Sequence, residues 1–353
     1  MNQVTQADVA REAGVSRGLV SLALSDSANV AEGTKQRILE VAHRLGYSRN
    51  LGAAMLAARS SSLVGVLLPN LRNPFFESVV SAIQQVADGR GVVAFTSTGN
   101  SQVEREKQVL RSFCSLRVGG VIAVSPMLSA AQLADVVGNT PACLVGASSY
   151  GAPVSAVHID EGVAARLAVD HLLEQGFGEL VVLCPAGEAK DAAMRVRSEE
   201  LVRAAKASGA SLRMCPTDNP YDEVRRVLDA ARVSLPNEGR ATASSTVLGG
   251  GAPPSERSVA NKRLGIIAYN DQIGVEAVSA VRSLGLRLGV EAGVLSYDNT
   301  FYADRGERGI TSIDQTPVRM AEAVFELLED TNGVARDVTL EPQLVARAST
   351  EAQ

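Results

Sequence analysis

Apolar residues at the start of the chain recur with the spacing of short amphipathic helices. The stretch from Thr5 to Leu24 predicts two of them around Gly14, which suits a turn that needs positive φ. A small residue, Ala10, stands where these two helices would touch, and Val20 would lock the second against the first. A third helix is predicted by apolar residues at i, i+3, i+4 and i+7, ended by Gly46: Ile38, Val41, Ala42 and Leu45. The pattern predicts an all-α helix-turn-helix head over residues 1–46.

From Leu63 onward, continuous apolar runs alternate with amphipathic helices. Such runs predict buried strands of a parallel sheet that helices cover on both faces. The alternation starts again after Asp160, so the residues after the head predict an α/β body of two doubly wound parallel-sheet subdomains. Subdomain one is expected over about 63–160 and 316–333, and subdomain two over about 161–315 and 336–349. The helices of the body are expected at about 73–91, 102–116, 192–208, 221–233 and 317–330, with two more that run through His171 and up to Gly285.

Two segments fall outside this pattern. Residues 47–62 include NLGAAMLAA, a marginal two-turn helix, and then a polar linker, which together predict a connector between head and body. Residues 236–262 hold Gly, Pro and Ser clusters without periodicity and are longer than a usual connection. We expect a surface insertion there, because its glycines lack the strand-to-helix context of a phosphate-binding loop.

Composition changes the picture in one respect, the distribution of charge. The 353 residues are 46% hydrophobic and carry a net charge of −5, which by itself argues against a nucleic-acid partner. Residues 1–60, however, hold seven Lys or Arg against five acids, a charge of +2 that leaves −7 for the remainder. A basic head on an acidic body fits a DNA reader joined to a separate sensor.

Compartment and chemistry are constrained mainly by what the sequence lacks. The chain opens without the basic and apolar regions of a signal peptide, and no stretch approaches the ~20 apolar residues of a membrane helix. We therefore expect a cytoplasmic protein, associated with the nucleoid through DNA, with no membrane partner. The four cysteines have no metal-like spacing and are expected as buried free thiols. No nucleophile–base set, metal cluster or cofactor motif stands out, which predicts no enzyme activity, no metal and no cofactor.

Several motifs in a fixed order resemble the lactose-repressor/galactose-repressor family of bacterial transcription regulators. The resemblance runs from Val4 to Thr350 through these segments: GVSRGLVSLAL, LGYSRN, NPFF, DHLLEQGFGEL, AYND, LSYDN and EPQLVARAST. It implies a periplasmic-binding-protein-like body and a homodimer that binds a pseudo-palindromic operator in double-stranded DNA. It also implies that the protein is a transcription regulator, most often a repressor in this family. A small effector, most often a sugar, would bind in the cleft between the subdomains and control it. No heptad segment follows the last motif, so a dimer is expected rather than a tetramer.

The resemblance assigns DNA-binding residues in the head and the connector. Arg17 and Gly18 match positions that face base edges in the major groove, and Leu22 stands where a polar residue is usual. Thr5, Ser16 and Ser21 suit phosphate oxygens or helix caps. The connector matches the family's hinge, which would begin at Asn50 and place Leu56 in the minor groove.

The resemblance also assigns ligand-binding residues in the body. Arg197 matches the family's ligand-clamping arginine, although the usual glycine three residues later is Glu200, and Asp298 matches its ligand-binding acid. Further candidates are the strand-end residues Asn73, Phe75 and Asn270, with Tyr221 for stacking. Taken one by one, each also suits a salt bridge, a cap or a packed position.

Two other functional classes are open at this point. A soluble sugar-binding protein of a transport system has a similar core, but the missing signal peptide and the predicted head argue against it. An α/β enzyme has no residues in the sequence to support it.

Overall fold

The computed structural model describes residues 4–24, 29–47, 62–186, 192–234, 263–304, 309–330 and 332–351. It forms two compact units, Met1–Ser61 and Ser62–Gln353. The expected connector residues Asn50 and Leu56, and the expected insertion at 236–262, lie outside the described residues. Among the described residues, no helix combines the length and the apolar character needed to cross a bilayer.

The first unit contains three helices, α1 (Gln6–Ala13), α2 (Arg17–Leu24) and α3 (Glu32–Arg44). Thr5 and Asp8 form a capping box at the start of α1, and the Ser16 hydroxyl accepts from the backbone N–H of Leu19 at the start of α2. Gly14 ends α1 with a φ of 65°, as the turn requires. The three helices enclose one apolar core that includes Val9, Ala10, Val20, Ile38 and Val41. The predicted helix-turn-helix head is confirmed.

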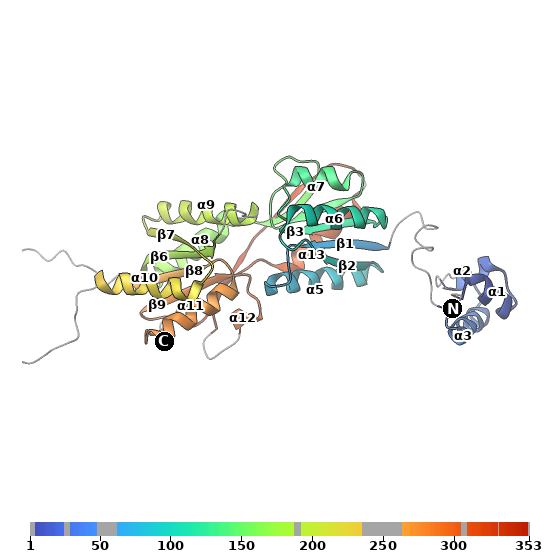
Figure 1. The fold of residues 1–353 in the computed structure, drawn as a ribbon, viewed down its shortest axis with the longest axis horizontal. Coiled ribbons are helices and arrows are strands. Elements are labelled where there is room, and N and C mark those ends of the chain that lie inside the picture. Colours follow the sequence, from blue (N-terminus) through green and yellow to red (C-terminus); the bar gives the residue numbers. More distant parts are fainter. Residues whose placement is uncertain are drawn as a thin grey trace, which may run out of the picture. The chain divides into compact units, whose positions relative to one another are not determined.

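The second unit contains two six-stranded sheets (Figure 1). The first has the order β11-β5-β4-β3-β1-β2, and all its strands run parallel. Its strands are β1 (Leu63–Leu68), β2 (Val93–Thr98), β3 (Gly120–Val124), β4 (Ala142–Val145), β5 (Ser155–Ile159) and β11 (Asp337–Leu340). The helices α5 (Pro74–Gly89) and α13 (Pro317–Glu329) pack together on this sheet, and so do α6 (Val103–Ser115) and α7 (Ala130–Val137).

The second sheet has the order β12-β10-β9-β8-β6-β7. Its strands are β6 (Phe177–Pro185), β7 (Ser211–Thr217), β8 (Arg263–Ala268), β9 (Ala292–Tyr297), β10 (Thr311–Asp314) and β12 (Gln343–Val345). β12 pairs antiparallel with β10, and the other pairs are parallel. One layer holds α8 (Glu161–Glu174) and α9 (Ala192–Ala207), and another holds α10 (Pro220–Ser234), α11 (Asp271–Ser283) and the short α12 (Phe301–Asp304).

The two predicted doubly wound subdomains are therefore confirmed, with one correction to their boundaries. Residues 336–349 were expected in subdomain two, yet β11 pairs with β5 in the first sheet. The described chain passes between the subdomains at Asp160, at Gln315 and between β11 and β12. Of the cysteines, Cys143, Cys184 and Cys215 are buried free thiols, as expected, whereas Cys114 is half-buried.

Candidate functional site

The exposed face of α2 is the candidate DNA-binding surface of the head. Val20 and Ala23 turn into the core, and the residues exposed to solvent are Arg17, Gly18, Ser21 and Leu22. The spacing i, i+1, i+4 and i+5 puts these four positions on one side of a helix. The eight residues of α2, all of them described, include no carboxylate, so nothing in this helix repels a phosphate. Thr5 and Ser16 serve as the caps already described.

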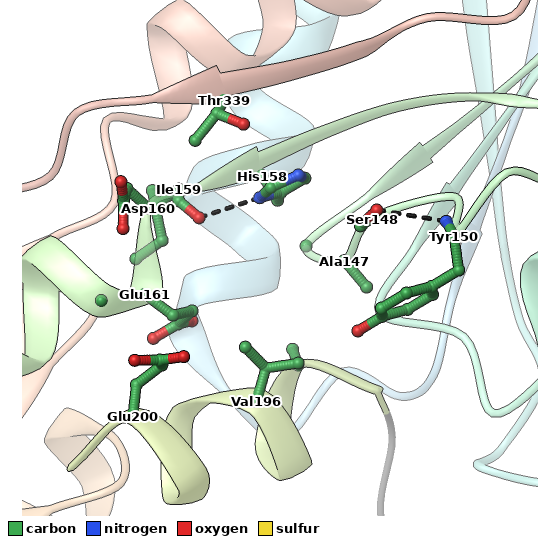
Figure 2. A pocket seen from close by; sticks show the side chains of 13 residues that line it. Ala147, Ser148, Tyr150, His158, Ile159, Asp160, Glu161, Val196, Glu200 and Thr339 are labelled. Atoms are coloured by element: carbon green, nitrogen blue, oxygen red, sulfur yellow. Dashed lines mark hydrogen bonds between the residues drawn. The ribbon is translucent and has the colours of Figure 1, made fainter. Parts of the chain in front are cut away.

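A cavity of about 340 Å³ in the second unit takes its walls from both subdomains (Figure 2). Subdomain one contributes the loop after β4, the end of β5 and Thr339 of β11. Subdomain two contributes the start of α8 and one face of α9. The polar side chains that line the cavity are Ser148, Tyr150, His158, Asp160, Glu161, Glu200 and Thr339. None of the six expected ligand residues is among the lining residues.

Local hydrogen bonds fix the polar groups of this cavity. The Asp160 carboxylate caps α8 by accepting from the N–H of Val163 at 2.9 Å. The Ser148 hydroxyl accepts from the N–H of Tyr150 at 3.1 Å and donates to Asp337 at 2.5 Å. Figure 2 shows the Glu161 side chain, from α8, and the Glu200 side chain, from α9, at the cavity. The lining residues, all described, include no Lys or Arg, so the cavity offers hydrogen-bond acceptors and no permanent cation.

Arg197 lies behind the cavity wall, where it forms a buried ion pair with Glu161. Its side chain is 4% exposed, and its Nη2 donates to Glu161 Oε1 at 2.8 Å. Its Nε also donates to Glu161, and its Nη1 donates to the carbonyl of Tyr269. The guanidinium lies over the rings of Tyr269 and Tyr297, with 4.8 and 4.1 Å to the ring centroids. The expected clamping arginine thus positions the Glu161 carboxylate, which itself reaches the cavity.

Asp298, which directly follows β9, and Asn73, the N-cap of α5, belong to different subdomains and bond to each other. Asn73 Nδ2 donates to Asp298 Oδ2 at 3.0 Å, and Gln315 Nε2 donates to Asp298 Oδ1 at 2.5 Å. Burial raises the pKa of the Asp298 carboxyl to about 7, against the lowering effect of Arg197 and of these hydrogen bonds. The nearby Asp271 carboxylate adds to the rise. This expected ligand acid is therefore a buried link between the subdomains.

The remaining expected ligand residues serve packing and capping in this structure. Phe75 is 4% exposed in the core of the second unit, and Tyr221 packs against the apolar cluster between α10 and α11. Asn270 caps α11 by accepting from the N–H of Ile273 at 2.9 Å. The structure therefore brings Asn73 to Asp298, Arg197 to the backbone beside Asn270, and the backbone N–H of Phe75 to the side chain of Asn73.

Sequence reasoning missed the residues that line the cavity. Ser148 and Tyr150 lie in a loop without periodicity. Glu200 departs from the family's glycine and, beside Glu199 on a polar helix, is expected from the sequence to be a solvated carboxylate. A usable signal was present at Asp160 and Glu161, since both directly follow a strand at the crossing between the subdomains.

Two family models match this chain. Residues 5–50 match the model described as bacterial regulatory proteins, lacI family. Residues 169–350, just over half of the chain, match the periplasmic binding protein-like domain. The chain belongs to the lacI family of bacterial regulatory proteins. A lacI-family protein is a DNA-binding transcription regulator and not an enzyme, which confirms both of these expectations.

Curated relatives and solved structures agree with the family. The HTH-type transcriptional regulator DegA of Bacillus subtilis (strain 168) is 23% identical over 351 residues, which cover 97% of each chain. A lac repressor dimer bound to operator and the anti-inducer ONPF superimposes with a TM-score of 0.78 at 22% identity, over 99% of this chain and 100% of that one. A complex of the transcriptional regulator CelR with cellobiose has a TM-score of 0.62 at 22% identity, over 98% and 100% of the chains.

Proposed function

We propose that this lacI-family protein is a homodimeric repressor that binds a pseudo-palindromic operator under the control of a small effector. The effector is an uncharged polyhydroxylated molecule, a sugar, held in the cavity between the subdomains. The observation that carries the proposal is the combination, in one chain, of a lacI-family head with a cavity walled by two subdomains.

The exposed face of α2 supports the operator-binding half of the proposal. In a helix-turn-helix the second helix enters the major groove, and there the Arg17 guanidinium can donate to O6 and N7 of a guanine. A head with a charge of +2 neutralises few phosphates, so one head alone binds weakly. Two heads of a dimer, bound to two half-sites of a pseudo-palindrome, add their contacts.

The chemistry of the cavity supports a neutral sugar. Carboxylates accept hydrogen bonds from sugar hydroxyls, and the hydroxyl groups of the cavity both donate to them and accept from them. The exposed Tyr150 ring offers an apolar face for a sugar ring. The described lining residues include three carboxylates and no Lys or Arg, which disfavours a phosphorylated sugar because no lining cation would bind its phosphate. Two of these carboxylates, Glu161 and Glu200, are paired with Arg197 and Arg203, which do not line the cavity. The likeness to a cellobiose complex of CelR favours the same class of ligand.

The position of the cavity supports control by the effector. A ligand that contacts both walls binds one relative arrangement of the subdomains more tightly than another, and so shifts their equilibrium. The bond from Asn73, the N-cap of α5, to Asp298, after β9, joins the same two subdomains, so it is sensitive to any such shift.

The test is binding of the full-length protein to labelled duplexes from the bacterial genome that encodes it. Fluorescence anisotropy should detect a preferred duplex, and sedimentation should give a dimer at micromolar concentration. A panel of neutral mono- and disaccharides should contain one that changes this affinity at least tenfold, while the matching sugar phosphates do not. The absence of any preferred duplex, or a monomer on DNA, rejects the proposed function. An effect of the phosphates alone rejects the neutral sugar.

A further inference from the structure

The exposed face of α2 contains a glycine that the fold of the head does not require. Gly18 is the second residue of α2 and has no positive φ, and a Cβ added to it would meet only the Ser16 hydroxyl, at 3.9 Å. Glycine weakens a helix relative to alanine, so folding alone favours alanine at this position. A residue without a side chain at this position instead allows a partner molecule to approach the backbone of α2 closely.

Leu22 lies four residues after Gly18 on the same exposed face. It is 42% exposed, although it belongs to a helix whose other large apolar residues turn toward the core. Side chains of a helix lean toward its N-terminus, so the Leu22 side chain leans toward the place that a side chain at position 18 would occupy. Gly18 and Leu22 therefore form a shallow apolar step beside the cationic Arg17.

We infer that the Gly18–Leu22 step reads the C5 methyl group of a thymine in the major groove. This inference rests on the proposed function and adds a specificity-determining residue to it. Among base edges in that groove, the thymine methyl is the apolar group, and apolar side chains are its usual partners. Gly18 lets the helix approach the base closely, and Leu22 excludes water from the methyl group. Arg17 on the same face favours DNA over an apolar protein partner, since it adds attraction to phosphate and guanine.

The test uses the full-length protein and the duplex that it prefers from a pool of randomised DNA. Each thymine of this duplex is replaced in turn by deoxyuridine, which removes only the methyl group. At one thymine in each half-site the parent protein should lose affinity about fourfold, the value for one buried carbon. Leu22→Ala should bind the parent duplex more weakly, and it should not distinguish thymine from deoxyuridine at that position.

Leu39 offers a matched control because it is also 42% exposed, on α3. Leu39→Ala should keep the parent's full sensitivity to deoxyuridine. Gly18→Ala should fold at least as well as the parent, yet bind the duplex roughly tenfold more weakly, because an added carbon overpacks the contact. Circular dichroism of each variant checks the fold of the head.

The outcomes separate this inference from the function on which it rests. If the pool yields no preferred duplex, the proposed function fails and the inference fails with it. If the protein prefers a duplex but ignores every thymine methyl, only the inference is overturned. It is also overturned if Leu22→Ala keeps the parent's sensitivity, or if Gly18→Ala binds as tightly as the parent.

Discussion

Asn73 and Asp298, 225 positions apart in the chain, share a hydrogen bond of 3.0 Å that joins the two subdomains. Asn73 also accepts from the N–H of Phe75 at the start of α5, so its amide is held from both sides. Gln315, at a crossing between the subdomains, holds the other oxygen of Asp298. The protonation of Asp298 therefore bears directly on how the subdomains are joined.

Asp298 should make the stability of the protein fall as the pH rises. Its pKa is about 7 in the folded chain and ordinarily 3.8, so the folded state holds the proton more tightly. The stabilisation is complete below about pH 4 and is lost as the pH rises to about 7. Between pH 5 and pH 8 the free energy of unfolding should fall by on the order of 2–3 kcal/mol, because each pH unit below the folded pKa contributes about 1.4 kcal/mol.

Urea unfolding of the parent and of Asp298→Asn at several pH values measures this effect. The other titrating groups are common to both proteins, so the difference between the two curves isolates Asp298. If the free energies of unfolding of the two proteins change in parallel from pH 5 to pH 8, the Asp298 carboxyl is ionised in the folded state throughout this range.

Removing Arg197 should lower the stability of the protein strongly. Arg197→Ala leaves the Glu161 carboxylate buried without its partner, which should cost about 3–5 kcal/mol of unfolding free energy. The double variant Arg197→Met with Glu161→Gln should recover much of the loss, because no unpaired charge then remains buried. Chemical denaturation of the parent and of the two variants measures these free energies of unfolding. Equal stability of the parent and Arg197→Ala would contradict the importance of the pair.

Glu200 should contribute to effector binding from α9. Glu200→Gln removes a charged acceptor from the cavity, so the affinity for the neutral sugar should fall by about 1.5–3 kcal/mol. Glu199→Gln is a close control. Glu199 directly precedes Glu200 in α9, and its side chain is exposed and does not line the cavity. Titration calorimetry measures both variants. A similar loss for Glu199→Gln would assign the effect to overall charge instead.

Arg17 should discriminate between operator sequences. Arg17→Ala should weaken binding to the preferred duplex by about 1–3 kcal/mol, because the bidentate contact to a guanine is lost. Its binding to unrelated DNA should change far less, since that depends on phosphate contacts. Anisotropy titrations with the preferred and the unrelated duplex give the ratio of the two affinities directly. A uniform loss on both duplexes would make Arg17 a phosphate contact.

The sequence predicted the sheets because their central strands are continuous apolar runs. β1 is buried along its whole length, and so is β3, which makes each of them visible as a block of Val, Ile and Leu. β11 escaped prediction because it is an edge strand with exposed positions, DVTL, and has no such block. Its assignment to the wrong subdomain follows from this missing signal.

The candidate site was harder to predict than the fold. Caps such as Thr5, Asn73 and Asn270 could be placed because a cap depends on a few neighbouring residues. The partners of Arg197 and Asp298 are set by packing between distant segments, so no local spacing reveals them. The same is true of the cavity, whose walls come from four separate stretches of chain.

The late return of the chain to the first sheet also has a consequence for synthesis on the ribosome. The head and its core are complete within the first 47 residues, and helices with such local contacts form early. The first sheet receives its edge strand β11 only at Asp337–Leu340, after most of the second sheet has been made. The nascent protein therefore carries a finished DNA-reading head long before either half of its sensor can close.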